Sequence, residues 1–581
     1  MVLMSSTLDL KLPAIEYLIA AVQGLYERNK LDIVTGIYQE AWGIRRLSQL
    51  AKSRLYKKSA PKDPIHVELL SLLMACSPEV PLPLQSSWLP VLVEELLLAK
   101  RFEWPAALLL ILEHAAHKEF KALSLDVPIS YVQLGEDLDY PLLKPTDFVR
   151  YIARFTFWEK LFGAESLCTG EKLLMSFWNK YQTLHPSFEL FHLTSPLPVH
   201  RCVPVMVHGD EGQHFKKGAV MVLQWQGVLG LGTTANQPKG NCMEEAKYIN
   251  QRRVTLSTRF LCSVMPKDFY ATDVKKLEAL FESICLDLRE AYLEGSDWPA
   301  YMETVDEELP WLPGDESSFT RLLPQDGNSL AGYYKPDIWH IVQLGVAKSW
   351  VASCFVLILP FLGGNSIPER LQALSAAYGF FCSSSVPKKT KFITKGITKE
   401  LLGWPSSSAC PEGHWNKGAL TTTFLEFLED FTSRRFFEQN EDEVLRLIAS
   451  GTRALNVFMK GLYAGDLFLT GNARVIVIDA GNHFLKASGR LAFLTFSNGE
   501  DRFPVTPKHH MMFHLCKLMQ WQSDVHGYCM NVLVDACYQD EDFVGRLARL
   551  CRAVSPRATA IRTIQRYLLQ TRAVWFKTDP D

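Results

Sequence analysis

The sequence predicts a mixed α/β protein in which a small antiparallel sheet lies between two mainly helical regions. Leucines recur at helical spacing before residue 196, and helical periodicity returns from about residue 400. Between them, short apolar runs bounded by glycine and proline are typical of strands. The 581 residues with 48% hydrophobic content are enough for several domains and a large core.

The N-terminal region, residues 1–196, is predicted to be helical. Leucine clusters at 69–73 and 92–98 are separated by prolines, and 144–150 and 172–181 also suit helices. We find no group of side chains in this region that indicates chemistry.

Neither the cysteines nor the apolar stretches indicate export or membrane insertion. The thirteen cysteines include no Cys-x-x-Cys pair, which argues against a disulfide framework or a zinc ribbon. The N-terminus lacks the pattern of a secretory signal. The apolar stretches at 88–113 and 349–359 are interrupted or shorter than the roughly 20 residues of a span, so we expect buried helices there. An intracellular protein, nuclear or cytoplasmic and not secreted, is predicted.

Three apolar runs predict an antiparallel meander. They cover Val203–Val207, Ala219–Trp225 and Thr258–Met265, with polar segments between them. A helix is predicted over Asp273–Glu294, and a second over Ile341–Leu359, buried against the sheet. The basic alternation at 388–399 is compatible with a further strand.

Three acids stand at structurally informative points. Asp210 ends the apolar run in Val-Pro-Val-Met-Val-His-Gly-Asp, Asp337 opens Asp-Ile-Trp-His, and Glu541 begins a basic amphipathic helix. Two strand-end aspartates and a helix glutamate, far apart in sequence, are what a scaffold needs to hold two divalent cations. Such a centre would cut or join phosphodiesters.

Each acid also has a structural interpretation. Gly-Asp-Glu-Gly around Asp210 suits a turn, and Asp337 suits the N-cap of the helix that follows it. His340, one turn later, is placed to orient Asp337, to touch a phosphate or to cap the sheet edge. Glu541 lies between Asp540 and Asp542 in an acidic helix start that the macrodipole favours, so any of the three acids could be the third member.

Basic residues near these acids predict a phosphate-binding surface. Lys216 and Lys217 follow Asp210, and Arg546, Arg549 and Arg552 lie on one side of the helix that carries Glu541. A solvated basic face is the alternative. The net charge of -2 excludes a uniformly basic coat, and the chain has neither a Walker loop nor a Gly-x-Ser-x-Gly elbow.

The order of these motifs resembles eukaryotic DDE-type transposases. The resemblance depends on six features in this order: His-Gly-Asp-Glu-Gly, a strand with Trp and Gly-x-Gly, Asp-x-x-His-x-x-x-Leu-Gly, a helical segment, Pro-Lys-His and a late Glu-bearing helix. The chain is most similar to the CACTA and Plavaka-like group and to transposon-derived proteins of dinoflagellate genomes. The resemblance covers about residues 197–581.

The resemblance implies a fold of class α/β: an RNase H-like mixed sheet core, interrupted by an all-α insertion and preceded by an all-α N-terminal region. The domains would be 1–196, a first core part at 197–400, the insertion at 401–529 and a core-closing basic helical segment at 530–581.

The resemblance also implies two Mg²⁺ or Mn²⁺ ions held by Asp210, Asp337 and Glu541, and metal-dependent cleavage and transfer of DNA strands. The partners would be DNA, as transposon ends and target, and a second copy of the chain, with no membrane. The chain departs from the pattern in lacking an N-terminal zinc finger, and 347–350 and 486–489 look eroded. A catalytically inactive, domesticated DNA-binding or protein-interaction relic is therefore the alternative, and a helical scaffold whose acids are caps and turns is the second.

Overall fold

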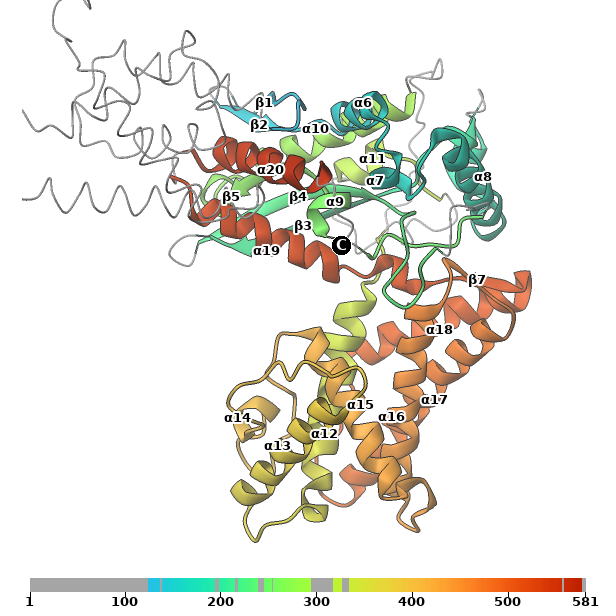
Figure 1. Cartoon of the computed structure of the whole chain (residues 1–581), viewed down its shortest axis with the longest axis vertical. Coiled ribbons are helices and arrows are strands. Elements are labelled where there is room, and N and C mark those ends of the chain that lie inside the picture. Colours follow the sequence, from blue (N-terminus) through green and yellow to red (C-terminus); the bar gives the residue numbers. More distant parts are fainter. Residues whose placement is uncertain are drawn as a thin grey trace, which may run out of the picture.

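A computed structural model describes residues 124–576, except for 136–137, 194–197, 215–217, 239–244, 253, 294–316, 327–333 and 556–557. The fold is mixed α/β, mainly helical with small antiparallel sheets, which confirms the coarse class. Figure 1 shows a sheet-containing body and, below it, a body made of helices. Lys216, Lys217 and the helices predicted before residue 124 lie outside the described residues.

The sheet of the first body is the predicted meander. It has the order β3-β4-β5, antiparallel throughout, with β3 at Val205–Gln213, β4 at Ala219–Gly227 and β5 at Phe260–Pro266. Strand β3 pairs with β4 along its whole length, and Asp210 stands opposite Val222. The alternative interpretation of Gly-Asp-Glu-Gly as a turn is therefore wrong, because continuous strand pairing overrides the local turn preference. Asp210 lies within the edge strand β3, and not at a strand end as predicted.

Two C-terminal helices return to this sheet, as Figure 1 shows. Helix α19 (Tyr538–Arg552) packs on β3 and β4, and α20 (Thr559–Trp575) packs on β5. The Tyr567 hydroxyl accepts a hydrogen bond from the Leu261 amide at 3.3 Å and donates to the Arg259 carbonyl at 3.1 Å. These bonds fix the end of the chain against its middle.

The described part of the N-terminal region belongs to the same body and is not wholly helical. It contains the hairpin β1 (Ser130–Gln133) and β2 (Asp139–Leu142), then α6 (Pro145–Phe155), α7 (Trp158–Phe162) and α8 (Leu167–Leu184). The Tyr140 hydroxyl donates to the Val264 carbonyl at 2.8 Å, which attaches the hairpin to β5. The hairpin corrects the all-α prediction, since its strands are four residues long and carry little periodic signal.

Helix α10 confirms the helix predicted over Asp273–Glu294, since it spans Val274–Leu293. The shorter helical elements of this body are η1 (Glu189–Phe191), η2 (Val199–Arg201), α9 (Thr255–Thr258), η4 (Lys267–Phe269) and α11 (Ser318–Leu322).

The second body is built from helices between Trp339 and His526. They are η6 (Trp339–Val346), α12 (Ala347–Ile358), η7 (Leu359–Phe361), α13 (Ile367–Ser384), α14 (Lys399–Leu402), α15 (Gly418–Arg434), η8 (Phe437–Gln439), α16 (Glu443–Ala464), α17 (Gly471–Ser497) and α18 (Pro507–His526). The short strands β6 (Phe468–Thr470) and β7 (Tyr528–Met530) pair beside them, and η9 (Val532–Asp535) leads back to α19.

Two predictions differ from this arrangement. Helix α12 packs against α15, and its Trp350 indole donates to Thr452 of α16 at 3.0 Å, so it is buried among helices and not against the sheet. The helical body thus starts at Trp339. Residues 388–398 form no strand: the Tyr378 hydroxyl of α13 donates to the Lys391 carbonyl at 3.0 Å, and the Ile397 amide donates to Ser375 of α13 at 2.8 Å. This segment is therefore held by α13, and Lys389 also pairs with Glu426 of α15 at 2.6 Å.

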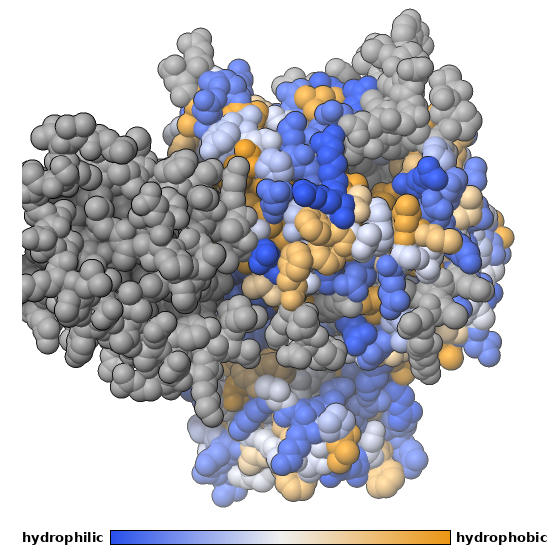
Figure 2. Space-filling view, turned by 45° about the horizontal axis from the view of Figure 1, so that its top comes forward, coloured by the Kyte–Doolittle hydropathy of each residue, from blue (hydrophilic) through white to orange (hydrophobic). Residues whose placement is uncertain are grey.

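Among the described residues, one stretch is long and apolar enough to cross a membrane by length and composition, at Trp339–Phe361. Its best window is 72% buried inside the protein, which is the behaviour of a core helix. On the face drawn in Figure 2, hydrophobic side chains form small patches among hydrophilic ones.

Candidate metal centre

Close packing between α19 and β3 brings the first and third acids together. A Cβ atom on Gly212 would lie 2.7 Å from Cβ of Ala548 and 3.2 Å from Val544, both on α19. The absent side chain therefore lets the helix approach the strand. Side chains alternate along a strand, so Asp210, two residues before Gly212, faces the same helix.

Glu541 and Asp210 form a pair of interacting carboxyl groups. Burial, and after it the nearby Asp210 carboxyl group, raise the pKa of Glu541 to about 7, with His340 opposing part of the shift. Two carboxyl groups can share a hydrogen bond only if one of them keeps its proton. This pair has an excess of negative charge that a cation would relieve.

Asp337 joins the helical body to the start of α19. As predicted, it caps its helix: Oδ1 accepts from the Trp339 amide at 2.9 Å, and Oδ2 from the His340 amide at 3.1 Å. It also accepts from Cys537, at 3.1 Å from the backbone amide to Oδ1 and at 2.8 Å from the thiol to Oδ2. Burial alone would raise the pKa of Asp337, but the bonds from His340 and Cys537 outweigh it and hold the pKa below its ordinary value.

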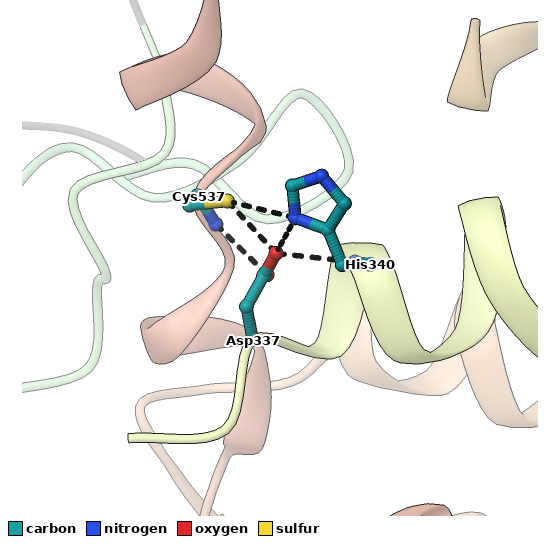
Figure 3. Close-up of side chains that lie close together, drawn as sticks. All are labelled: Asp337, His340 and Cys537. Carbon is teal, nitrogen blue, oxygen red and sulfur yellow. Dashed lines mark hydrogen bonds and ion pairs between the residues drawn. The ribbon is translucent and has the colours of Figure 1, made fainter. Parts of the chain in front are cut away.

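His340 connects the two sets of acids. Its Nδ1 lies 2.6 Å from Oδ2 of Asp337, and its Nε2 lies 3.8 Å from Oε1 of Glu541. The hydrogen bond to Asp337 raises the pKa of His340, and burial opposes this shift. Figure 3 shows the imidazole facing Asp337 and Cys537. The structure thus brings Asp210, Asp337 and Glu541 into one connected cluster through His340.

Of the three consecutive acids at the start of α19, Glu541 is the one that faces this cluster. Asp540 is 2% exposed and accepts from Arg259 at 3.3 Å and from Gln224 at 2.9 Å. Asp542 pairs with Arg546 at 2.7 Å on the outer side. Successive helical residues point about 100° apart, so the three neighbours meet three different surroundings.

Further charged groups surround the cluster. The positive charge of Lys508, at the start of α18, opposes the raised pKa of His340. Its Nζ lies 3.5 Å from the Leu344 carbonyl oxygen. Burial raises the pKa of Asp535 to about 6, opposed by Lys335 and reinforced by Asp337. Cations and acids therefore both border the site.

The arginines predicted to meet phosphate lie along α19. Arg549 and Arg552 are exposed, whereas Arg546 is half-buried and engaged by Asp542. Exposure leaves Arg549 and Arg552 accessible to a phosphate backbone.

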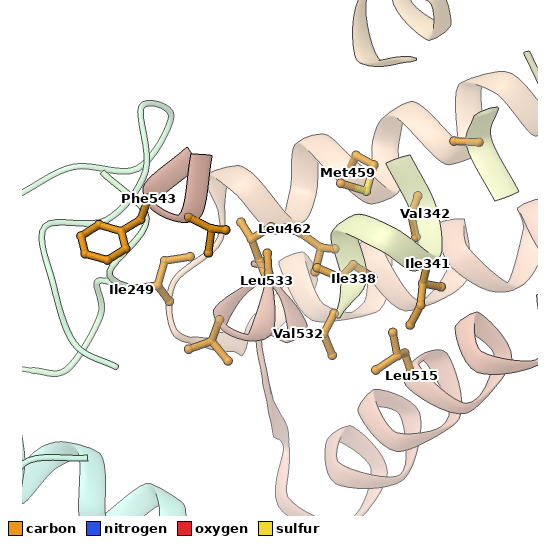
Figure 4. Close-up of a cluster of buried hydrophobic side chains, with 14 of the residues drawn as sticks. Ile249, Ile338, Ile341, Val342, Met459, Leu462, Leu515, Val532, Leu533 and Phe543 are labelled. Atoms are coloured by element: carbon orange, nitrogen blue, oxygen red, sulfur yellow. The ribbon is translucent and has the colours of Figure 1, made fainter. Parts of the chain in front are cut away.

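A hydrophobic cluster behind the acids holds their segments in place. Figure 4 shows Ile338, which follows Asp337, close to Leu462 of α16 and Leu533 of η9, with Ile341, which follows His340, farther along the same helix. All four side chains are buried. Such packing fixes the backbone on both sides of the site.

Two residues of the cluster have no counterpart among the predicted site residues. Cys537 lies one helical turn before Glu541, a spacing that places both near the same side of the helix start. Lys508 belongs to the Pro-Lys-His motif, whose position in the chain was noted without a role.

No protein-family model matches this chain, and no curated protein is significantly similar to it. The functional interpretation therefore depends on the geometry of the site and on the order of its motifs.

Proposed function

We propose that this chain is a DDE-type transposase-like protein, derived from a transposon, that cleaves and transfers DNA strands by metal-dependent phosphodiester chemistry. One feature carries the proposal: close packing of α19 on β3 brings the carboxyl groups of Asp210 and Glu541, far apart in sequence, within interaction range, and His340 links Glu541 to Asp337. A scaffold whose acids serve only as caps and turns gives no reason for the Asp210 and Glu541 carboxyl groups to meet.

The donor set fits divalent cations. Carboxylate oxygens are the ligands that Mg²⁺ and Mn²⁺ prefer. Burial and the nearby Asp210 raise the pKa of Glu541, and His340 offsets this only in part, so a cation would be favoured beside these carboxyl groups. Asp210 and Glu541 would supply oxygens to the ions, and Asp337 would contribute Oδ2.

The roles of the residues follow from their surroundings. When bound, the ions would activate a water or a DNA 3′ hydroxyl and stabilise the leaving oxygen. His340 holds Asp337 through Nδ1 and faces Glu541 with Nε2, so it positions both acids. Lys508 adds positive charge at the same place, where a DNA phosphate would lie.

The order of elements supports an RNase H-like core with an insertion. A strand with the first acid starts an antiparallel meander, helix α10 follows, and the last acid lies on a helix packed across that first strand. The helical body stands between Asp337 and Glu541, where the resemblance implies an insertion. DNA would meet Arg549 and Arg552 beside this centre.

One observation favours the inactive relic as the second candidate. Both oxygens of Asp337 already accept hydrogen bonds from the protein, which is the behaviour of a structural clamp. The relic would bind DNA in a salt-sensitive way without metal-dependent cleavage.

A DNA nicking and strand-transfer assay with Mg²⁺ or Mn²⁺ tests the proposal. Asp210→Asn and Glu541→Gln should each lower the rate roughly 100-fold or more, because each removes a charge that holds an ion. Matched controls are Glu211→Gln, whose carboxylate pairs with Lys267 at 3.0 Å, and Asp542→Asn, which pairs with Arg546. Absence of metal-dependent activity in the wild type, or equal losses in the controls, would overturn it.

A further inference from the structure

Three different donor types meet on one side of the cluster. The ligand atoms of Asp337, His340 and Cys537 all lie within 4.8 Å of one another, as Figure 3 shows. We propose that they form a separate cation position for a thiophilic transition metal such as Zn²⁺, next to an oxygen-only position between Asp210 and Glu541. This inference rests on the proposed function, because it assigns one of the two proposed ions, the one at Asp337, to this position and leaves the other between Asp210 and Glu541.

The choice of ion follows from the donors. A thiol sulfur and an imidazole nitrogen suit Zn²⁺ and related transition ions, whereas Mg²⁺ takes oxygen ligands and keeps its waters. Asp210 and Glu541 offer only carboxylate oxygens. The centre is therefore asymmetric, with a soft position at Cys537 and a hard one at Glu541.

The distances are close to those of a tetrahedral zinc site. Zinc bonds of about 2.0–2.3 Å place neighbouring donor atoms about 3.3–3.6 Å apart. Sγ of Cys537 already lies 3.5 Å from Nδ1 of His340. The contacts of Asp337 Oδ2 to Nδ1 and Sγ, at 2.6 and 2.8 Å, are hydrogen bonds that would lengthen by about half an ångström or more once the ion replaces their protons.

The surroundings orient these ligands. Nε2 of His340 faces Oε1 of Glu541 at 3.8 Å, so the carboxylate favours the tautomer with its proton on Nε2 and its lone pair on Nδ1. The Cys537 amide holds the other oxygen of Asp337 at 3.1 Å. Thiolate is the form of cysteine that binds metal, so binding releases the thiol proton to solvent.

Three protein ligands leave a fourth position for water or a phosphate oxygen. The His340 side chain is 45% exposed, so an ion and a ligand can reach the site from solvent. The proposed site therefore differs from a structural zinc site, in which four protein ligands fill every position.

Cobalt substitution tests the proposal without relying on activity. Titration of the full chain with Co²⁺ should produce a near-ultraviolet absorption band from thiolate-to-metal charge transfer, which Zn²⁺ should remove by competition. Cys537→Ser should abolish the band and His340→Gln should weaken Co²⁺ binding at least about tenfold. Cys168→Ser, at an exposed free cysteine, is the matched control and should keep the band.

Absence of the band in the wild type, or its persistence in Cys537→Ser, would overturn the proposal. Circular dichroism and thermal melting of each variant establish that it is folded. Asp210→Asn should keep the band, and its loss there would overturn the separation into two positions. A wild type that shows the band but no DNA cleavage would support this site and contradict the proposed function alone.

Discussion

Asp540 and Glu541 are neighbours on α19 but have opposite surroundings. Asp540 is buried against a cation, the Arg259 guanidinium, and against the amides of Gln224 and Gln226. Glu541 faces another acid, Asp210, and the edge of His340. One acid is neutralised by the protein and attaches the helix to the sheet. The other has only the half-exposed His340 as a cationic neighbour and shares its surroundings with a second acid, which is the property expected of a cation ligand.

The largest expected effect concerns the compensated acid. Asp540→Ala leaves the Arg259 charge buried without its partner, and we expect a loss of about 3–5 kcal/mol in the free energy of unfolding. Urea denaturation measures it. Asp542→Ala, which removes an exposed pair with Arg546, should cost at most about 1 kcal/mol. Equal losses of unfolding free energy in Asp540→Ala and Asp542→Ala would contradict the structural role of the buried Asp540–Arg259 pair.

The uncompensated acid should make stability depend on pH. The pKa of Glu541 is about 7 in the folded chain, above its ordinary value of 4.5, so the folded state binds more protons between these values. The free energy of unfolding should therefore fall as the pH rises through this window, by on the order of 1–3 kcal/mol. Below pH 4.5 Glu541 is protonated in both states, so its contribution to the free energy of unfolding is fully present and no longer changes with pH.

Urea unfolding at about pH 5 and about pH 7.5, with a chelator present, measures this difference. Glu541→Gln carries no titrating group and should lose this component of the pH dependence, while Asp542→Asn should keep it. If Glu541→Gln has the same pH dependence as the wild type, the raised pKa does not belong to Glu541, which contradicts this prediction.

A smaller effect is expected where the two acids are brought together. Gly212→Ala pushes against Ala548 and Val544 of α19 and should cost about 1–3 kcal/mol, since neither neighbour can move aside easily. Gly209→Ala on the same strand meets only the end of the Leu223 side chain, at 2.9 Å, and should cost less. Thermal unfolding of both variants gives the comparison, and equal costs would contradict the role of Gly212.

The smallest effect concerns DNA affinity. Arg549→Gln and Arg552→Gln should each reduce the slope of log affinity against log salt by about 0.9, because each removes one phosphate contact. Arg546→Gln should change it less, since Asp542 already engages Arg546. Fluorescence anisotropy with labelled duplex DNA measures these slopes. An unchanged slope in both exposed variants would favour a solvated basic face.

The meander and helix α10 could be predicted because β-branched runs and a long amphipathic period are local signals. Asp210 was expected at a strand end, with a turn as the alternative, because Gly-Asp-Glu-Gly has turn composition. What keeps it in a strand is non-local: pairing with β4 and the approach of α19 over Gly212. The strand expected at 388–399 is absent because side chains of α13 bind the backbone of this segment, which has no strand partner among the described residues.

In the candidate site, too, local sequence signals could be predicted and long-range contacts could not. Asp337 and Glu541 could be picked out as candidates because each stands at the start of a helix, whereas Asp210, predicted at a strand end, lies within β3. The proximity of the three acids could only be expected from a resemblance. Cys537 was missed because its partner Asp337 is remote in sequence, so no spacing rule connects them. The choice among Asp540, Glu541 and Asp542 needed the helix orientation, which packing on β3 and β4 determines.

The most direct measurement is anomalous diffraction from crystals of the full chain soaked in Mn²⁺. The account predicts a manganese peak between the carboxylates of Asp210 and Glu541, which would then no longer share a hydrogen bond. Crystals of Glu541→Gln treated in the same way should lack this peak. Asp210 and Glu541 still hydrogen-bonded to each other at saturating Mn²⁺, with no peak between them, would contradict the central claim.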